Sequence, residues 1–316
     1  MNPEAIIECV PNFSEGTDPA KVRQIVAAMQ VEGVRLLDWS LDTAHNRSVV
    51  TIAGSPNAVV EAAVLAVGKA SQLIDLTKQT GVHPRIGAAD VVPFVPVSGV
   101  SLAECAMLAR QAGLQIWRRY GIPVYFYGAA AARPDRVLLE DVRRGQFEGL
   151  REAALKDAAR RPDVGGPELH PTAGASAVGA RSFLIAYNIY LEPAPGDTQA
   201  PDVSVARSIA RDIRASSGGM HGVKAIGVVA QGRAQLSMNI TDYRVTSMHS
   251  VHAAVVQLAQ RYGAKASEGE LIGLIPEGAY EPESDWIRQI PGFDPADKVL
   301  ERRLHAPMAW PEAAAI

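Results

Sequence analysis

The segment GVHPRIGAADVVPFVP, Gly81–Pro96, joins a loop rich in glycine and proline to an apolar run. The run, Val91–Val97, contains two prolines. Proline in a sheet is confined to edges, strand starts and bulges, because it has no backbone N–H to donate. We therefore predict a strand that lies at a sheet edge or bends there. This strand closes the first of two similar series of elements.

Upstream of this strand, the chain alternates between strand-like and helix-like patterns. Short runs rich in apolar and β-branched residues predict three strands, at Ala5–Val10, Val34–Asp38 and Ser48–Ala53. Asp18 and Ser55 each stand before a proline, which predicts a capped helix start at both places. These helices should run to about Met29 and Leu76, so the order up to Val97 is β-α-β-β-α-β.

Downstream, Ser101 and Glu104 have the S-x-x-E spacing of a capping box, ahead of a predicted helix at Ala106–Tyr120. An aromatic strand and two charged helical segments are predicted next, at Pro123–Tyr127, Pro134–Arg144 and Phe147–Arg160. Residues Pro162–Gly179 contain seven glycines and prolines without periodicity. We predict that this stretch connects two domains, and it is long enough to be functional as well.

The second half repeats the order of the first. The predicted elements, in chain order, are Ser182–Leu191, Val203–Ser216, Lys224–Ala230, Ala234–Ile240, Met248–Tyr262 and Leu271–Ile275. This series is the split βαβ motif. We therefore predict an α/β (α+β) protein of two tandem βαββαβ subdomains, each a mixed sheet with helices on one face, with a ligand cleft between them. The expected domains are residues 1–178 and 179–305, followed by a disordered tail, 306–316.

The composition excludes several classes of protein. The 316 residues carry a formal charge of −3, so we predict no nucleic acid and no membrane surface as partner, because both favour basic proteins. We expect no signal peptide, because the first residues include an early acid and no long apolar run, and no stretch approaches the roughly 20 apolar residues of a spanning helix. Cys9 and Cys105 lie far apart and match no metal or redox spacing. These features predict a soluble, cytoplasmic protein without a metal site.

His83 is the leading candidate for chemistry. Gly81, Pro84 and Gly87 stiffen its loop, so the ring is presented on a rigid turn. An imidazole can both take and give a proton near neutral pH. Asp90 could orient this ring or pair with Arg85. The alternative interpretation is a loop histidine that forms only local hydrogen bonds.

A second polar cluster, Asp42 with the run His45–Arg47, lies between two predicted strands and could face the same cleft. A solvated hairpin turn is the alternative. Arg181 could hold a carboxylate with both ends of its guanidinium group. His249 and His252 are spaced to share a metal ion, but no third ligand is near in sequence, so ordinary helix histidines are favoured.

Four segments resemble those of the glutamate formimidoyltransferase (formiminotransferase) family. They are CVPNFSEG, HNR, GVHPRIGAADVVPFVP and GASAVGARSFLIAYNI, beginning at Cys9, His45, Gly81 and Gly174. The resemblance runs from about Ile6 to about Ile275. It implies transfer of a formimino group from N-formimino-L-glutamate to tetrahydrofolate in histidine degradation. It also implies two subdomains around a folate tunnel, and a homodimer.

The resemblance also implies roles for individual residues. The catalytic histidine of the family falls on His83. The family's assisting acid aligns with Ser40, and Asp42 could replace it. The candidates for binding the substrates are Arg47, Arg85, Asn46 and Arg181. The folate-binding stretch falls on Gly166, Pro167, Glu168, Leu169, His170, Pro171, Thr172, Ala173 and Gly174.

Three alternatives stay open at this point. One is formyl transfer involving 5-formyltetrahydrofolate on the same scaffold, and another is a folate-binding protein without catalysis. The third is a metal hydrolase that uses His249 and His252. The animal members of the family continue into a cyclodeaminase domain, which we expect this chain to lack.

Overall fold

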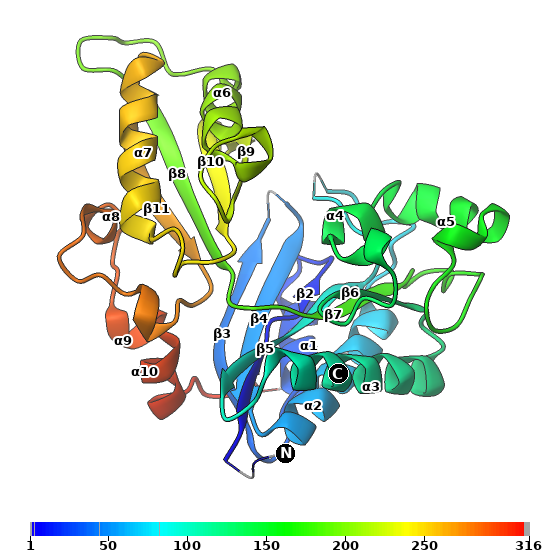
Figure 1. The fold of residues 1–316 in the computed structure, drawn as a ribbon. Coiled ribbons are helices and arrows are strands. Elements are labelled where there is room, and N and C mark those ends of the chain that lie inside the picture. The colour runs from blue at the N-terminus through cyan, green and yellow to red at the C-terminus, as the bar shows by residue number, and fades with distance from the viewer. Residues whose placement is uncertain (1, 3, 44, 82, 313–316) are drawn as a thin grey trace. The chain divides into compact units, whose positions relative to one another are not determined.

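The computed structural model describes residues 2, 4–43, 45–81 and 83–312, and it divides into two compact domains (Figure 1). The first domain comprises the chain up to Arg181 together with the residues from Pro307 on, and the second comprises Ser182–Ala306. The boundary therefore falls three residues later than predicted. Ser176–Ala180, predicted as the end of a connecting loop, is a strand paired within the first sheet.

The first domain is built on a seven-stranded mixed sheet. Its strands are β1 (Ile6–Cys9), β2 (Asn12–Phe13), β3 (Val34–Asp42), β4 (Arg47–Gly54), β5 (Ala89–Ser98), β6 (Val124–Gly128) and β7 (Ser176–Ala180). The order is β1-β4-β2-β5-β7-β6, with β3 paired to β4. The strands β5, β7 and β6 are parallel, and the other pairs are antiparallel.

The strand β5 lies inside this sheet and not at its edge. It pairs with β1 and β2 on one side and with β7 on the other. Its two prolines are accommodated because the ladders to β1 and β2 are short and each contains a register shift. We expected this strand either to lie at a sheet edge or to bend, and the irregular pairing agrees with a bend.

Helices cover both faces of the first sheet. The three long helices, α1 (Pro19–Ala28), α2 (Pro56–Leu73) and α3 (Leu102–Tyr120), pack on one face. The short helices α4 (Leu139–Val142) and α5 (Gln146–Lys156) cover a second core on the other face. Successive side chains of β6 point to opposite faces of the sheet and so contribute to both cores. Val124 and Phe126 face the first core, and Tyr125 and Tyr127 face the second. The expectation of helices on one face alone is therefore corrected for this domain.

Capping explains where the helices begin. The Asp18 side chain accepts hydrogen bonds from the N–H groups of the first turn of α1, and Ser101 and Glu104 form the predicted capping box of α3. Ser55 precedes α2 but makes no capping hydrogen bond. The single helix predicted at Pro134–Arg144 is instead a 3₁₀ turn (Pro134–Arg136) followed by α4, because the backbone is extended at Leu138.

The second domain has the predicted β-α-β-β-α-β order, in β8 (Ile185–Pro193), α6 (Val203–Ile213), β9 (Val223–Ala230), β10 (Arg233–Ile240), α7 (Met248–Arg261) and β11 (Ala264–Ile272). The sheet order is β11-β8-β10-β9, and all pairs are antiparallel, so this sheet is not mixed as expected. Three short helices follow: α8 (Asp285–Arg288), α9 (Pro295–Lys298) and α10 (Leu300–His305). The strand β11 begins earlier than predicted, because a register shift after Ala266 breaks its alternation.

The segment after α10 returns to the first domain. The N–H of Met308 donates a 2.8 Å hydrogen bond to the carbonyl of Leu36, and Met308 and Trp310 pack against the first core. The described part of the expected tail, up to Glu312, is therefore ordered, and residues 313–316 lie outside the described residues. Among the helices in the described part of the chain, none is long and apolar enough to cross a membrane.

Candidate active site

His83 lies at the centre of a charged cluster in the first domain. Its Nδ1 is 2.7 Å from Nη1 of Arg47, the first residue of β4, and 2.8 Å from the carbonyl oxygen of Pro84. The same Nη1 donates a 3.0 Å hydrogen bond to Oδ2 of Asp90, in β5. Arg143, which ends α4, donates to that oxygen as well. Three segments distant in sequence thus meet in one cluster.

Backbone and amide groups fix the charged side chains. Asp90 is 0% exposed, and its Oδ1 accepts a 2.8 Å hydrogen bond from the N–H of Ile86, which closes the turn after His83. Oδ1 of Asn12, in β2, accepts from Nε and Nη2 of Arg47 at 2.9 and 2.7 Å. All three nitrogens of the Arg47 guanidinium group are therefore engaged. A cluster held this way has its orientation set before any substrate binds.

The electrostatics of the cluster favour a neutral ring. Burial and the positive charges of Arg47 and Arg143 lower the pKa of His83 to about 3. Burial and the neighbouring Arg143 lower the pKa of Arg47 to about 10, while Asp90 opposes that shift. Burial acts to raise the pKa of Asp90, but the two arginines outweigh it and the pKa is lowered. At neutral pH the site holds two cations, one carboxylate and an uncharged imidazole.

Asp42 contacts His45, and His45 in turn packs against His83. Its Oδ2 is 2.6 Å from Nδ1 of His45, and its Oδ1 accepts a 2.9 Å hydrogen bond from the His45 N–H. The ring of His45 stands edge-on to the ring of His83, with their centroids 6.3 Å apart. The three side chains form a series in which Asp42 orients the ring that contacts the candidate catalytic histidine.

Arg85 has different partners from those considered in the sequence. It is 7% exposed, donates to both Oε1 and the backbone carbonyl of Gln79, and forms a 2.9 Å ion pair with Glu148 at the start of α5. The N–H of Phe147 donates to the Arg85 carbonyl. Arg85 therefore ties the loop before β5 to α5, whereas Asp90 pairs with Arg47 and Arg143.

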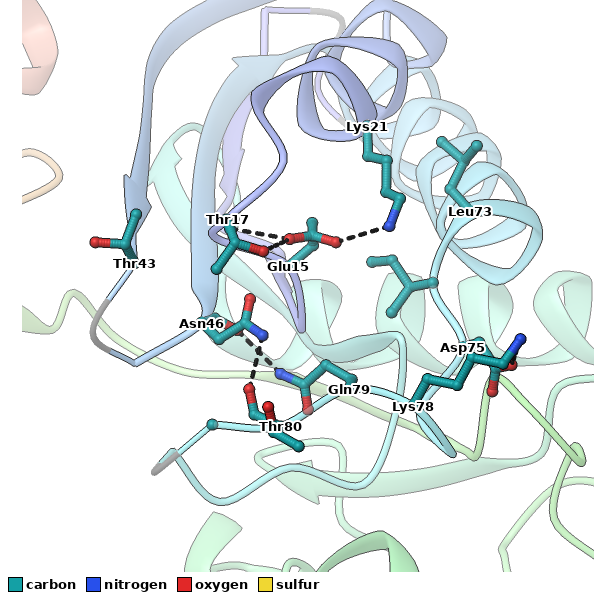
Figure 2. Close-up of a pocket in the computed structure, with 12 residues that line it drawn as sticks. Glu15, Thr17, Lys21, Thr43, Asn46, Leu73, Asp75, Lys78, Gln79 and Thr80 are labelled. Carbon is teal, nitrogen blue, oxygen red and sulfur yellow. Dashed lines mark hydrogen bonds and ion pairs between the residues drawn. The ribbon is translucent and has the colours of Figure 1, made fainter.

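Asn46 joins three loops near the site. Its Oδ1 accepts from the N–H of Gly16. Its Nδ2 donates to the carbonyl of Thr80, and its backbone carbonyl accepts from Gln79 (Figure 2). The residue has a φ of 50°, which non-glycine residues rarely adopt. These contacts border a pocket of about 640 Å³ between the start of α1, the tip of the β3–β4 hairpin and the loop after α2. The charged Glu15 and Lys21 in this pocket pair with one another at 3.2 Å.

The stretch Gly166–Gly174 is an ordered loop in the first domain. The N–H and carbonyl groups of His170 and Gly174 bond each other, and the N–H groups of Leu76 and Ala88 donate to carbonyls in the same stretch. Gly174 has a φ of 69° and forms a bridge with Gly87, close to the loop that carries His83. The stretch is thus bonded to the segments that follow α2 and precede β5, and it is not a flexible linker.

Arg181 follows β7 at the end of the first domain. Its N–H donates to the carbonyl of Phe94 in β5 at 3.1 Å. Its side chain also acts on Tyr127: burial raises the pKa of that phenol to about 12, and Arg181 opposes the shift. Arg143 acts on the same phenol. Arg181 is half-buried, and its guanidinium group lies close enough to Tyr127 to act on that phenol.

His249 and His252 do not converge on one point. Nδ1 of His249 is 3.1 Å from Oγ of Ser284, and Nδ1 of His252 is 3.0 Å from the hydroxyl of Tyr187. Within the part of the chain that the structure describes, no three His, Cys, Asp or Glu side chains are grouped to hold a metal ion. The helix-histidine interpretation agrees with these contacts.

Two members of the cluster were not recognised in the sequence. Arg143 stands in the charged run Leu139–Arg144, whose pattern is that of a solvated helix face. Asn12 lies in the CVPNFSEG segment, but an asparagine after a proline is also an ordinary turn residue. Only the tertiary structure, which packs α4 against β6, shows that Arg143 reaches Asp90.

The fold and this site define a two-domain α/β protein with a neutral histidine held among buried charges. Two family models match the chain: the N-terminal subdomain of the formiminotransferase domain matches residues 6–181, and the formiminotransferase domain matches residues 186–301. The chain belongs to the formiminotransferase family.

Three relatives show how far the similarity extends. Glutamate formimidoyltransferase of Streptococcus pyogenes serotype M1 is 41% identical over 302 residues, which cover 95% of this chain and 98% of the relative. The protein of the same name from Thermoplasma acidophilum is 40% identical, with coverage of 95% and 97%. Formimidoyltransferase-cyclodeaminase of Rattus norvegicus is 40% identical, but the match covers 86% of this chain and 50% of the rat protein.

Proposed function

We propose that this protein is a glutamate formimidoyltransferase. It transfers the formimino group of N-formimino-L-glutamate to tetrahydrofolate, giving 5-formiminotetrahydrofolate and L-glutamate, as a step of histidine degradation. Similarity to two relatives of that name over almost their whole length supports the proposal. The observation that carries it is the neutral His83 ring, held by Arg47 within a cluster of buried charges.

The proposed mechanism uses one imidazole for two proton transfers. His83 accepts the proton of N5 of tetrahydrofolate as N5 forms a bond with the amidine carbon of the donor. The resulting imidazolium then protonates the glutamate nitrogen as the bond from the amidine carbon to that nitrogen breaks, which restores the neutral ring. General acid–base catalysis of this kind contributes about 10²–10⁴-fold, and the alignment of two substrates contributes more.

The low pKa of His83 suits the second transfer. An imidazolium flanked by two guanidinium groups is a strong acid, so it gives its proton readily to the departing nitrogen. The same charges make the neutral ring a weak base, which limits the first transfer. We propose that binding of the anionic substrates offsets part of this positive charge and so balances the two steps.

Asp42 enters the proposal through His45. Its carboxylate holds the His45 ring, and that ring packs edge-on against His83. We therefore assign Asp42 as a positioning residue for the candidate catalytic ring. This indirect role is supported by the 6.3 Å between the two ring centroids.

The roles of the arginines and Asn46 are refined by their contacts. Arg47 and Arg85 are each held by protein acceptors, which supports a role in positioning His83 and its loop more than one in binding substrate carboxylates. Asn46 likewise holds loops together. Arg181 stays a candidate for a carboxylate. The stretch Gly166–Gly174 stays the proposed folate-binding segment, supported by its ordered backbone beside the His83 loop.

The proposal extends to the setting of the enzyme. Tetrahydrofolate is a co-substrate in it, formiminoglutamate is the second small molecule, and no resident metal takes part. We also propose a cytoplasmic homodimer, as the family resemblance implies.

A comparison of two donors tests the function. Purified protein is incubated with tetrahydrofolate and formiminoglutamate, and in parallel with 5-formyltetrahydrofolate and glutamate, and the folate products are separated by chromatography. We expect 5-formiminotetrahydrofolate in the first reaction at a rate at least a hundredfold above that of the second. Turnover in the second reaction alone would replace the proposal with formyl transfer, and folate binding without turnover in either would identify a binding protein.

A further inference from the structure

The Asp90 carboxylate lies between the two arginines of this cluster. Its Oδ2 accepts from Nη1 of Arg47 at 3.0 Å and from Nη2 of Arg143. Both arginine side chains are 13% exposed and the Asp90 side chain is 0% exposed, so water screens these charges weakly. The three groups together leave one net positive charge beside His83.

The two contacts of Nδ1 of His83 make opposite demands on the ring. A guanidinium N–H can only donate, so the 2.7 Å contact with Arg47 requires Nδ1 to accept and places the ring proton on Nε2. A carbonyl oxygen can only accept, so the 2.8 Å contact with Pro84 requires a proton on Nδ1 and leaves the lone pair on Nε2. The neutral ring therefore has two tautomers with one favourable contact each.

We propose that Asp90 and Arg143 are positioning residues that set the protonation of His83: Arg143 keeps the ring neutral, and Asp90 shifts its tautomers toward the form with the Nε2 lone pair free. Nη1 of Arg47 has two N–H groups and serves both acceptors, but the Asp90 carboxylate draws the positive charge of Arg47 toward itself and so weakens the hydrogen bond to Nδ1. When Asp90 holds Arg47, the Pro84 carbonyl becomes the better partner of Nδ1. The catalytic meaning of this arrangement rests on the proposed function.

Every described element around the ring contributes a group to this balance. Arg47 comes from β4, Asp90 from β5 and Arg143 from the end of α4. His45 faces the ring from the β3–β4 connection, and the Pro84 carbonyl from its own loop. Because Arg143 acts on His83 by its charge, and Asp90 acts through Arg47, their removal has opposite and separable effects.

Nitrogen NMR of the full-length protein, labelled with ¹⁵N in its histidines, tests the proposal. The shifts of Nδ1 and Nε2 report both tautomer and protonation, and a His83→Asn sample identifies the His83 signals. We expect Arg143→Gln to raise the protonation midpoint of His83 by about one pH unit or more, as removal of a neighbouring, weakly screened cation does. Arg143→Lys keeps the charge and should stay close to the wild type.

The neighbouring residue supplies a matched control. Arg144 is paired with Asp141, and its side chain is 77% exposed. Arg144→Gln makes the same chemical change one position away, and the midpoint should not move. If Arg143→Gln gives the wild-type midpoint, or if Arg144→Gln shifts it equally, the role of Arg143 is overturned.

Asp90→Asn tests the second half of the proposal. The amide oxygen keeps the hydrogen bond from Ile86, but the charge that holds Arg47 is gone. We expect the neutral ring to shift toward the tautomer protonated on Nε2, and the midpoint not to rise. An unchanged tautomer ratio in a folded variant overturns the role of Asp90. If this variant does not fold, the Arg143→Gln and Arg143→Lys variants still decide whether the charge of Arg143 lowers the protonation midpoint of His83.

These measurements need no substrate. A wild-type protein that transfers no formimino group would contradict the proposed function, while the ring titration would be unaffected. An active protein whose ring does not respond to Arg143 or Asp90 would contradict this inference alone.

Discussion

Nη1 of Arg47 lies 2.7 Å from Nδ1 of His83 and donates a 3.0 Å hydrogen bond to Oδ2 of Asp90, so one guanidinium group joins the candidate catalytic ring to a buried carboxylate. The relationship explains why a ring on a loop keeps one orientation. It also explains how a partly buried histidine stays uncharged at neutral pH. A fixed orientation and a ring that is uncharged before the substrates bind are both needed if His83 is to accept a proton.

The depressed pKa of His83 predicts how stability depends on pH. The folded ring has a pKa of about 3, against 6.5 for an ordinary histidine, so the folded chain binds fewer protons than the unfolded chain between these values. The associated stability is complete above about pH 6.5 and is lost as the pH falls toward 3. When the pH is lowered from about 7 to about 4.5, the free energy of unfolding should therefore fall less for His83→Asn than for the wild type. The difference between the two falls should be on the order of 2 kcal/mol.

Urea unfolding at several pH values checks this prediction. His305→Asn, at an exposed ring near the end of α10, serves as the control and should follow the wild-type curve. Parallel stability curves for wild type and His83→Asn would mean that the ring protonates as easily when folded as when unfolded.

The pairing of Asp42 with His45 predicts that these residues act as a unit. Asp42→Asn and His45→Gln should each lower kcat by about tenfold, which corresponds to about 1.4 kcal/mol in the barrier. The double variant should be no slower than either single one, because each removes the same arrangement. Steady-state kinetics of the four proteins measures this coupling. Asp157→Asn, at the cap of a 3₁₀ turn elsewhere in the domain, is the control. Fully additive losses of kcat would show that Asp42 and His45 act independently.

The contacts of Arg85 predict a loss of stability and of kcat together. Arg85→Met breaks its bonds to Gln79 and Glu148, which fix the loop before β5, and hydrogen bonds to charged groups contribute about 1.5–3 kcal/mol each. We expect a lower thermal midpoint, a lower kcat and little change in KM. Glu148→Gln, which keeps a hydrogen-bond acceptor, should show a smaller effect. A large rise in KM for one substrate would instead assign Arg85 to substrate binding.

Two glycines predict opposite responses to the same substitution. A Cβ at Gly174, where φ is 69°, would stand 2.2 Å from the carbonyl oxygen of Ile86, so Gly174→Ala should destabilise the protein by several kcal/mol. Gly149 lies inside α5 with no atom within 4 Å of such a Cβ, so Gly149→Ala should stabilise by up to about 1 kcal/mol. Calorimetry distinguishes the two signs, and equal shifts would contradict the backbone geometry of the proposed folate segment.

The order of helices and strands along the chain could mostly be predicted from the sequence, but which strands are neighbours in the sheet could not. The cap residues Asp18 and Ser101 predict helix starts because capping is local, and those predictions are confirmed. The central place of β5 and the strand β7 inside a glycine-rich stretch depend on pairing between distant segments. Such pairing leaves little local signal, because Ala and Gly in β7 fit a crowded sheet interior without resembling a strand.

The site shows the same limit. His83 was recognisable from its stiff loop, since glycine and proline act on neighbouring residues. The link from Asp90 to Arg143 spans 53 positions and depends on where α4 packs, so no spacing rule predicts it. Of the two roles considered for Asp90, pairing with Arg85 followed proximity in sequence, whereas the structure pairs Asp90 with Arg47 and Arg143.

The most direct test of the account is kcat for formimino transfer by His83→Asn, measured beside the wild type with tetrahydrofolate and formiminoglutamate at saturation. Asparagine keeps polarity and approximate size but does not exchange protons, so kcat should fall by at least about a hundredfold while KM for the folate changes little. A variant that turns over at the wild-type rate would show that His83 is not the proton shuttle.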